Sequence, residues 1–463
     1  MRKLFDFLFV LAAAVATLPA LGQTDITISE IQTRRFRVMQ RCPDGIVLLH
    51  ATVGYKHWDE SGFHQDQNFY YFTGLPNASA AILAIDGAAQ ESWLFVPPQP
   101  KGPKMGPDLT GMNRVLFAPG EVTESELGIE HVVSWDVLVP YLDGRLKSKP
   151  DLVLYLDSGG QTSGMQTLFG SNPADLLAIA SLNQAWHAAV QAKWSSATLR
   201  DAYPLLDGVR QVKSVAEVAR LRKASTITVA GFWAGVQAIA PGKTQRQVEG
   251  EVVNACLQAG SEGMSLWPWV RSGPFSLGST LFEAFADYRN LDRQMQADEV
   301  VRLDLGCDYQ MYKGDFGRTI PVSGQFNEWQ REVMELLNGA YLAGVNKLQP
   351  GESPQEVFKA TVGYIEHHRN DFKTAQAREA AAAFLKQPNT PLHALGVDMA
   401  EGVGKSFLPG NVLCYEPLLA AGGQAFFVED TFLITATGHE VLNPALPYGP
   451  DDIESAIARI RHR

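Results

Sequence analysis

The pattern of apolar and polar positions predicts an α/β layer in the first part of the chain. Short apolar runs typical of strands alternate there with segments of helical periodicity, which is the order found in α/β domains. An aromatic run at 69–76 is interpreted as a core strand followed by a Gly-Pro turn. The expected strands are 45–51, 80–85, 92–96, 115–118 and 152–156, and the expected helices are 33–40, 135–146, 173–180 and 182–193.

Beyond residue 205 the pattern predicts a second domain that combines long amphipathic helices with strands. Ser214 and Glu217 have the spacing of a capping box, in which each side chain binds the backbone N–H of the other residue. We therefore expect an N-terminal domain over 23–205 and a second domain over 206–463. The expected helices of the second domain are 214–225, 244–259, 328–348 and 354–369, and its expected strands are 300–303, 318–322, 412–417 and 426–435.

Two aspartates interrupt the apolar segments of one predicted hairpin in the second domain. Asp304 follows the strand that begins at Val300, and Asp315 precedes the strand at 318–322, with a polar, Gly-containing turn between them. A lone carboxylate in such a setting is costly to remove from water, so each needs a partner or both share a cation. This hairpin alone does not choose between a structural pair and a metal site.

Three more ionisable residues interrupt apolar segments of the same domain: His393, Glu416 and Glu429. Each one alone has an ordinary structural explanation, but five interruptions in one domain indicate a shared site. Four carboxylates and a neutral imidazole carry 4 × (−1) = −4, which two divalent cations would balance. Without cations the crowded carboxylates would repel one another and take up protons. The ligand set suits Mn²⁺, Co²⁺ or Zn²⁺ and does not choose among them.

Composition narrows the classes of function. With 463 residues, 46% of them hydrophobic, the chain can bury a full core, and its net charge of −11 argues against a nucleic-acid surface. Residues 1–22 predict a signal peptide, because Arg2 and Lys3 precede a short apolar run that ends in small residues. The mature protein would then start at Gln23, outside the membrane, and be periplasmic or extracellular.

The four cysteines are too few and too scattered for a disulfide framework in a chain of this length. Cys307 and Cys414 stand close in sequence to the predicted site residues, and in an oxidising compartment they can pair. The alternative is that all four, including Cys42 and Cys256, are small buried side chains.

Five runs that contain the candidate ligands resemble the M24 metallopeptidases of pita-bread fold, and within that family they are most similar to aminopeptidase P and prolidase. The runs are Leu303-Asp-Leu-Gly, Gly314-Asp-x-x-Arg-Thr, His393-x-Leu-Gly, Glu416-Pro and Val428-Glu-Asp-Thr. Upstream, Arg34-Arg35, 68–74 and 209–217 look like that group's N-terminal domain and first pita-bread helix. The resemblance covers essentially the whole mature chain. It implies an α/β N-terminal domain followed by an α+β pita-bread catalytic domain.

The resemblance also implies a role for each ligand. Asp304 and Asp315 would hold one ion, His393 and Glu416 would complete the shell of a second, and Asp315 and Glu429 would bridge the two. Manganese is the favoured ion, with cobalt or zinc as alternatives. A metal-bridging hydroxide would attack the peptide carbonyl, with Glu416 as proton acceptor. The implied reaction is release of an N-terminal residue ahead of proline, or cleavage of an Xaa-Pro dipeptide, by a homo-oligomer.

The chain departs from the family at three positions on the substrate side. Two non-ligand histidines and an arginine are expected there, and Asp287, Ala400 and Phe427 stand in their places. Asp287 can still bind a substrate amine, and His57 or His64 of a neighbouring subunit can supply a hydrogen-bond donor. Three functions therefore stay open: an Xaa-Pro exopeptidase, a related metallohydrolase acting on another amide or ester, and a weakly active or inactive metal-binding homologue.

Overall fold

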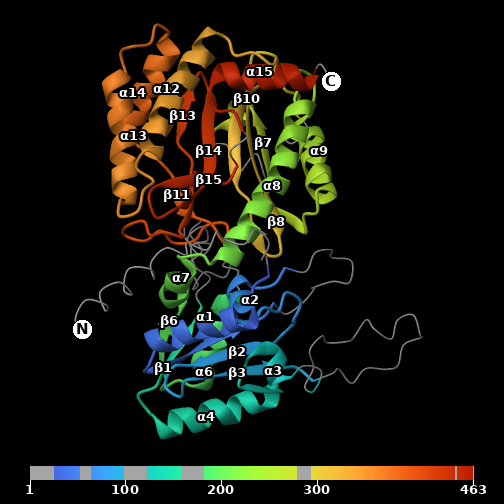
Figure 1. The fold of residues 1–463 in the computed structure, drawn as a ribbon, viewed down its shortest axis with the longest axis vertical. Helices are drawn as coiled ribbons and strands as arrows, with labels where there is room; N and C mark the ends of the chain where they lie inside the picture. The colour runs from blue at the N-terminus through green and yellow to red at the C-terminus, as the bar shows by residue number, and fades with distance from the viewer. Residues whose placement is uncertain are drawn as a thin grey trace, which may run out of the picture.

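The computed structural model describes residues 25–52, 64–98, 120, 123–157, 182–278, 293–443 and 446–461. Figure 1 shows two lobes, with helix α8 running from their junction into the second lobe. The expected signal peptide, the strand at 115–118 and the helix at 173–180 lie outside the described residues. Within these ranges, no helix combines the length and the apolar character needed to cross a membrane.

The N-terminal lobe is built on a six-stranded sheet in the order β4-β3-β2-β1-β5-β6. β1 is antiparallel to β2 and parallel to β5, so hairpin and crossover connections are mixed. The predicted α/β layer is confirmed. The strands are β1 (Gly45–His50), β2 (Ile82–Asp86), β3 (Glu91–Val96), β4 (His131–Ser134), β5 (Val153–Leu156) and β6 (Thr198–Asp201). The helices are α1 (Ile28–Arg41), α2 (Gln67–Thr73), α3 (Glu124–Leu127), α4 (Leu138–Ser148) and α6 (Leu182–Lys193).

Strand β1 is buried on both faces, because alternate side chains enter two different cores. Val47 and Leu49 belong to a cluster with α1 and α2, whereas Ile46 and Leu48 pack with α4 and α6. The first cluster also contains Tyr312 of the second lobe, so the two lobes share a core. The predicted domain boundary at residue 205 falls within α7 (Tyr203–Arg210), and it stays a prediction.

The aromatic run that predicted a core strand is instead helix α2, and that prediction was wrong. Asp66 caps the helix by accepting a hydrogen bond from the Phe69 N–H at 2.8 Å. Gly74 ends it in the left-handed conformation, at φ 76°. The residues from Asn68 to Thr73 are all buried, so the helix lacks a polar face. A fully buried helix and a fully buried strand give the same continuous apolar run, and hydrophobic periodicity cannot separate them.

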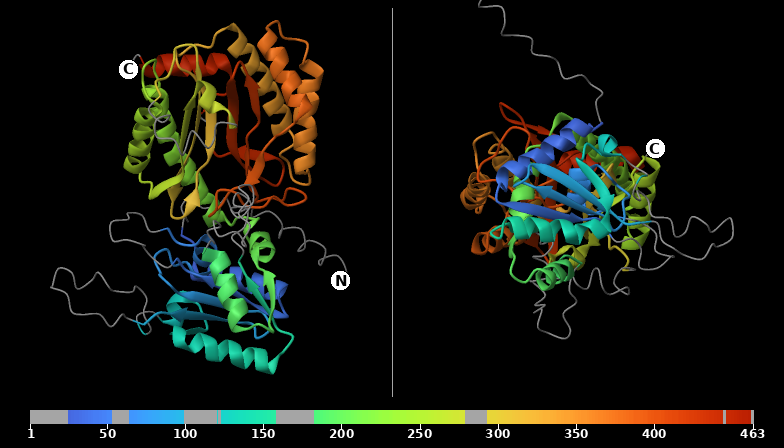
Figure 2. Two further views of the ribbon diagram at one scale, coloured as in Figure 1. Left: turned by 180° about the vertical axis from the view of Figure 1, so that it is seen from behind. Right: turned by 90° about the horizontal axis from the view of Figure 1, so that it is seen from below.

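The second lobe contains a nine-stranded sheet whose main path runs β11-β12-β14-β10-β8-β7. All of its strand pairs are antiparallel, and helices surround it in the left view of Figure 2. The expected pita-bread architecture is confirmed. The strands are β7 (Gly263–Ser272), β8 (Val300–Tyr309), β9 (Tyr312–Lys313), β10 (Phe316–Pro321), β11 (Leu392–Ala394), β12 (Val412–Tyr415), β13 (Leu418–Ala421), β14 (Gln424–Ile434) and β15 (His439–Val441). The helices are α8 (Val215–Ala238), α9 (Gln245–Gln258), α12 (Glu328–Val345), α13 (Pro354–His368), α14 (Ala375–Lys386) and α15 (Pro450–Arg461).

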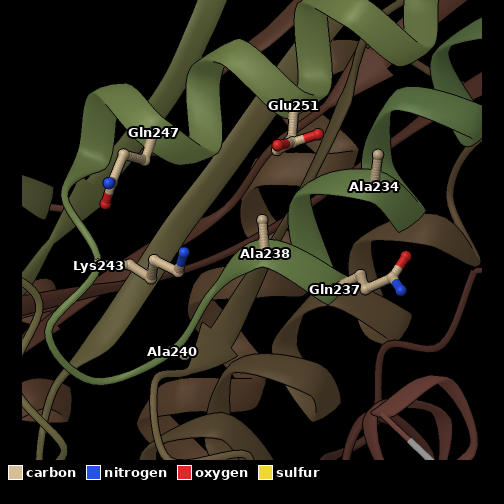
Figure 3. A pocket seen from close by; sticks show the side chains of 7 residues that line it. All are labelled: Ala234, Gln237, Ala238, Ala240, Lys243, Gln247 and Glu251. Carbon is tan, nitrogen blue, oxygen red and sulfur yellow. The ribbon is translucent and has the colours of Figure 1, made fainter.

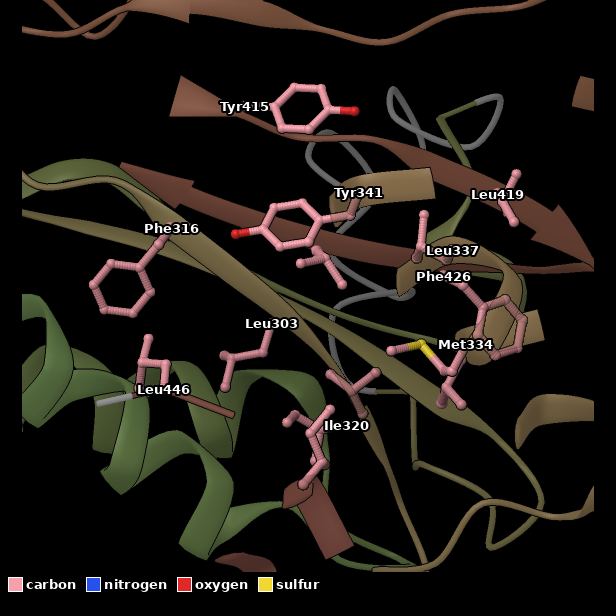
Figure 4. Close-up of a cluster of buried hydrophobic side chains, with 14 of the residues drawn as sticks. Leu303, Phe316, Ile320, Met334, Leu337, Tyr341, Tyr415, Leu419, Phe426 and Leu446 are labelled. Atoms are coloured by element: carbon pink, nitrogen blue, oxygen red, sulfur yellow. The ribbon is translucent and has the colours of Figure 1, made fainter. Parts of the chain in front are cut away.

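A large apolar cluster between this sheet and its helices fixes the strands that carry the candidate site. Figure 4 shows Leu303 of β8 and Phe316 of β10 in the cluster, with Tyr341 of α12 and Tyr415 of β12. The Tyr341 and Tyr415 rings stack with centroids 5.8 Å apart. Because Leu303 and Phe316 flank Asp304 and Asp315 along the chain, this packing also sets where the two carboxylates project.

The cysteines pair differently from the pairing considered above. Cys256 of α9 is bonded to Cys307 of β8, while Cys42 and Cys414 are free and buried. A Cys307–Cys414 bond is therefore excluded. Helices α8 and α9 can approach closely because residue 231 of α8 is a glycine. A Cβ added there would lie 2.5 Å from the Cys256 sulfur of α9.

Candidate metal centre

Three neighbouring strands bring the first carboxylates to one face of the sheet. Gly317 of β10 lies opposite Asp304 of β8 on one side and opposite Glu429 of β14 on the other. Residues directly opposite one another across antiparallel strands project from the same face, so Asp304 and Glu429 flank the site. Gly317 makes room for the Phe427 ring on this face, because a Cβ there would lie 2.3 Å from a ring carbon of Phe427.

His393 enters the same site from β11. Its Nε2 lies 3.5 Å from Asp315 Oδ2, 3.8 Å from Glu416 Oε1 and 3.9 Å from Glu429 Oε1. The other ring nitrogen, Nδ1, lies 3.2 Å from the Ala394 carbonyl oxygen, to which it can donate. That hydrogen bond leaves Nε2 unprotonated and directed at the carboxylates, as a metal-binding imidazole requires.

All five predicted ligands therefore gather in one place, although they come from three strands (β8, β11 and β14), from the position just before β10 and from the turn that follows β12. The shape of the sheet explains this, since the strands that carry them are adjacent along its path. A thiol that the sequence did not predict joins them: one ligand atom each from Asp315, His393, Cys414 and Glu429 lie within 4.8 Å of one another. Cys414 stands two residues before Glu416 on a strand, and that spacing places both on one face.

The protonation of the cluster follows from its burial. Burial, with repulsion from neighbouring carboxylates, raises the pKa of Asp315 and the pKa of Glu429 well above their usual range. The same two causes raise the pKa of Glu416 to about 7. Burial lowers the pKa of His393, which favours the neutral imidazole. A divalent cation would remove the need for these protons by stabilising the anionic carboxylates.

Glu429 and the adjacent Asp430 show which carboxylates lack a protein partner. Asp430 is satisfied by the side chains of Arg318, at 2.7 Å, and of Tyr341. Glu429 Oε2 is buried and has no hydrogen-bond partner among the described residues. An unpaired buried carboxylate oxygen beside a free imidazole nitrogen fits a metal ion, because such an oxygen is otherwise costly to bury.

Arg302 is a site residue that the sequence analysis missed. Its Nη2 donates to Asp304 Oδ2 at 3.1 Å and lies 3.7 Å from Glu416 Oε2. The available signal was its place two residues before Asp304 on a strand, which puts both side chains on one face. Counting Arg302 changes the charge of the cluster from −4 to −4 + 1 = −3.

The structure describes two of the three positions at which the chain departs from the family. Asp287 lies outside the described residues, as does His57, so the proposed amine contact stays a prediction. Ala400 is partly buried and brings no donor side chain, and Phe427 is buried beneath the Arg302 guanidinium, 4.0 Å from the centroid of its ring. His64 is exposed. Among the histidines that the structure describes, His393 alone forms ion-pair contacts with the cluster carboxylates.

A buried ion-pair network ties the His393 strand to the N-terminal lobe. Ala394 and Glu401 exchange backbone hydrogen bonds at 3.2 and 2.9 Å. The Glu401 carboxylate accepts from Arg210 and from Lys213, each at 2.7 Å. Arg210 also donates to Asn68 Oδ1 of α2 at 2.7 Å. Although burial opposes its ionisation, these two cations lower the pKa of Glu401 to about 2.

Replacing Glu401 with Gln should lower the free energy of unfolding by about 3–5 kcal/mol at pH 7, because two buried cations lose their anion. Since the pKa of Glu401 is about 2 when folded and about 4.3 when unfolded, its contribution is present above about pH 4.3 and fades as the pH falls toward 2. Urea unfolding of wild type and E401Q should therefore show a difference that shrinks between pH 5 and pH 3.

The matched control is Glu440→Gln, which breaks an ion pair with Arg222 whose side chains are 43% and 42% exposed. Exposed pairs contribute little, so the control should lose less than about 1 kcal/mol. Equal losses in the two variants would contradict the assigned role of the buried network.

A surface hollow between α8 and α9 is a separate feature (Figure 3). It mixes one lysine and one glutamate with alanine and glutamine side chains, and none of the five predicted ligands lines it. Its lining residues are Ala234, Gln237, Ala238, Ala240, Lys243, Gln247 and Glu251. The carboxylate cluster is accordingly the candidate functional site.

Comparison with known proteins gives two family matches. Residues 219–436 match the model of metallopeptidase family M24, and residues 31–105 match that of the aminopeptidase P N-terminal domain. The Xaa-Pro aminopeptidase of Escherichia coli (strain K12) is 25% identical over 95% of this chain and 99% of its own length. The Xaa-Pro aminopeptidase of Haemophilus influenzae is 24% identical over 92% of this chain and 96% of its own length.

Solved structures agree on the fold. Proline aminopeptidase P II from Yersinia pestis superposes with a TM-score of 0.72 at 24% identity, over 94% of this chain and 100% of that protein. Aminopeptidase P from E. coli with the inhibitor Pro-Leu gives a TM-score of 0.70 at 25% identity, over 95% of this chain and 100% of that one. Both lobes of the chain therefore have counterparts in these structures.

Proposed function

Residues 219–436 of this chain belong to metallopeptidase family M24, and we propose that the protein is an exported aminopeptidase that removes the residue ahead of a proline. The family implies divalent metal binding. We assign the site two divalent cations, manganese by preference, held by Asp304, Asp315, His393, Glu416 and Glu429. The observation that carries the assignment is the buried Glu429 Oε2, which has no hydrogen-bond partner within the described part of the chain and lies beside the unprotonated Nε2 of His393.

The side chains of the cluster differ in solvent exposure, and this difference indicates which of them can act on the substrate. Divalent cations held there would polarise a substrate carbonyl and make a bound water more acidic. The side chains of Asp304, Asp315 and Glu429 are 7%, 5% and 2% exposed, which suits ligands that do not meet the substrate. The Glu416 side chain is 19% exposed, so it is the carboxylate best placed to accept and return a proton during hydrolysis.

A peptide with proline in the second position is supported by the names of the relatives, which are Xaa-Pro aminopeptidases. An Xaa-Pro dipeptidase would use the same centre and differs only in the length of peptide accepted. The homo-oligomer that the resemblance implies stays a prediction.

One observation favours a second candidate function. Ala400 and Phe427 leave the described surroundings of the metal centre without the histidine and arginine side chains expected there, and Arg302 introduces a guanidinium from a different strand. A changed set of donors suits a metallohydrolase acting on another amide or ester. In that case the cations would bind, and the preference for proline would be absent.

A matched pair of tripeptides separates the two functions. The manganese-loaded protein should release the first residue of an Xaa-Pro-Xaa peptide and fail to do so when the amine is acetylated, since an aminopeptidase needs the free N-terminus. The Xaa-Ala-Xaa peptide is the control and should be cleaved more slowly. Hydrolysis of both peptides at one rate, or of an ester alone, would favour the second candidate.

Export is proposed from residues 1–22 alone, which carry the charge and apolar pattern of a signal peptide. N-terminal sequencing of the protein recovered from outside the cytoplasm should begin at Gln23. Recovery of a chain that still begins at Met1 would remove the export proposal and leave the metal centre untouched.

A further inference from the structure

Cys414 places a thiol among the candidate ligands of the metal centre. Its Sγ belongs to a set of four ligand atoms, with one each from Asp315, His393 and Glu429, that lie within 4.8 Å of one another. Cys414 is fully buried and takes no part in the disulfide bond, so its sulfur stays a thiol inside the cluster. The centre therefore offers a soft sulfur donor besides the carboxylates and the imidazole that the sequence predicted.

The register of three strands directs this thiol at the cluster. Cys414 of β12 lies directly opposite His393 of β11 on one side and opposite Thr431 of β14 on the other. Residues opposite one another in antiparallel strands project from the same face, and Glu429 shares that face because it stands two residues before Thr431. The sulfur lies 3.4 Å from the Thr431 hydroxyl, which itself donates to the Asp315 carbonyl oxygen. The backbone thus fixes the sulfur beside the imidazole and the carboxylate.

The spacing of these atoms suits a single ion in tetrahedral coordination. In a tetrahedral zinc site with bonds of about 2.0–2.3 Å, neighbouring ligand atoms lie about 3.3–3.8 Å apart. His393 Nε2 is 3.5 Å from the Asp315 carboxylate and 3.9 Å from that of Glu429. Glu429 Oε2 is buried and has no hydrogen-bond partner among the residues that the structure describes, so it is available as a ligand. With the Cys414 sulfur, the donors number four, which is the shell that zinc takes in closed protein sites.

A thiol changes which ion this part of the centre favours. Sulfur ligands select zinc, whereas carboxylates and water suit manganese. For a given set of nitrogen, oxygen and sulfur ligands, zinc also binds more tightly than manganese. The two remaining candidate ligands, Asp304 and Glu416, are both carboxylates, so the soft donor is confined to the atoms around His393. Zinc therefore gains a contact there from which manganese profits little.

We propose that Cys414 is a metal ligand and that, with Asp315, His393 and Glu429, it forms a four-ligand zinc site that competes with manganese for the centre. As zinc binds, the zinc–sulfur bond replaces the sulfur–hydrogen bond and the thiol proton passes to the solvent. This inference rests on the metal centre of the proposed function. It adds the residue through which zinc competes with the manganese that hydrolysis would use.

Cobalt reports directly on the proposed sulfur ligand. Addition of CoCl₂ to the chelator-treated, full-length protein should produce a sulfur-to-cobalt charge-transfer band in the near ultraviolet, because cobalt accepts thiolate and imidazole ligands as zinc does. Cys414→Ser removes the sulfur, keeps a small polar side chain and should lose the band. Cys42→Ser is the matched control, since Cys42 is the other free, buried cysteine and lies at the end of α1. That variant should keep the band.

Competition between the two ions measures the consequence for metal choice. Titration of the chelator-treated protein with ZnCl₂ in the presence of MnCl₂ should show zinc displacing manganese from wild type. Cys414→Ser should weaken zinc binding by about tenfold or more, a range that even the partners of metal ligands reach, and leave manganese binding nearly unchanged. X-ray absorption at the zinc edge needs no variant that must fold. In zinc-loaded wild type it should show a sulfur neighbour at about 2.3 Å.

Zinc-loaded wild type without a sulfur neighbour would overturn the inference, and so would a cobalt band or a zinc affinity that is unchanged in Cys414→Ser. None of these results depends on peptide hydrolysis. Turnover of Xaa-Pro peptides by the manganese-loaded protein, with no sulfur bound to zinc, would remove the inference and keep the proposed function. Sulfur-bound zinc without such turnover would do the opposite. A wild-type protein that binds no divalent cation would remove both.

Discussion

Replacing Asp315 with Asn should reduce Xaa-Pro peptide hydrolysis by about 10³-fold or more, since loss of a metal ligand removes several kcal/mol of transition-state stabilisation. Asp315 Oδ2 lies 3.5 Å from His393 Nε2. Burial, together with repulsion from neighbouring carboxylates that include Glu416, raises the pKa of Asp315. Asn keeps the shape of the side chain and removes its charge. Initial rates at saturating substrate, together with elemental analysis of the protein, should show both the lost rate and a lost cation.

Asp371→Asn is the matched control, because Asp371 is an exposed residue just beyond the end of α13 that pairs with His368. This variant makes the same chemical change away from the centre and should hydrolyse peptide at the wild-type rate. If Asp315→Asn keeps more than a tenth of the wild-type rate with its cations still bound, Asp315 is not a functional ligand.

Removing the cations with a chelator should abolish hydrolysis and also lower the free energy of unfolding. A cation present at 100 times its dissociation constant stabilises the folded protein by about 2.7 kcal/mol, and chelation removes that contribution. Restoring manganese should return both activity and stability. Thermal or urea unfolding in the presence and absence of chelator measures the effect without reference to any substrate.

The size of this cation effect should rise with pH. Without cations, burial and repulsion raise the pKa of Glu416 to about 7, against about 4.3 in the unfolded chain. The folded, cation-free protein then binds protons that the unfolded chain has released, so its stability falls as the pH rises through this window. Bound manganese stabilises the anion and should remove this loss. A stabilisation by manganese that stayed constant from pH 5 to pH 7 would contradict the account.

The five ligands could be predicted because each is a charged or ionisable residue where an apolar strand makes such a residue costly. Asp304 and Glu429 were found in this way, and the sheet brings them together on either side of Gly317. Arg302 is just as unusual in a buried strand. It was missed because its place at the site depends on the aromatic rings that stack on its guanidinium. These rings belong to Trp269 and Phe427, which come from strands far apart in the sequence.

Other parts of the fold could not be predicted from the sequence, and the physical reasons differ from one part to another. Helix α2 has no polar face, so its apolar run matched a strand equally well. Strand β7 was not predicted, and the register shifts between Met264 and Trp269 break its alternation. The Cys256–Cys307 bond depends on the close packing of α8 and α9 at Gly231, which sequence spacing does not report.

The most direct test of the central claim is anomalous diffraction from a crystal of the full-length protein grown with manganese. Anomalous density is expected between Asp315, His393 and Glu429, with ligand atoms about 2.0–2.3 Å from the ion. Manganese density elsewhere in the molecule, with none at these three residues, would contradict the assignment of the centre.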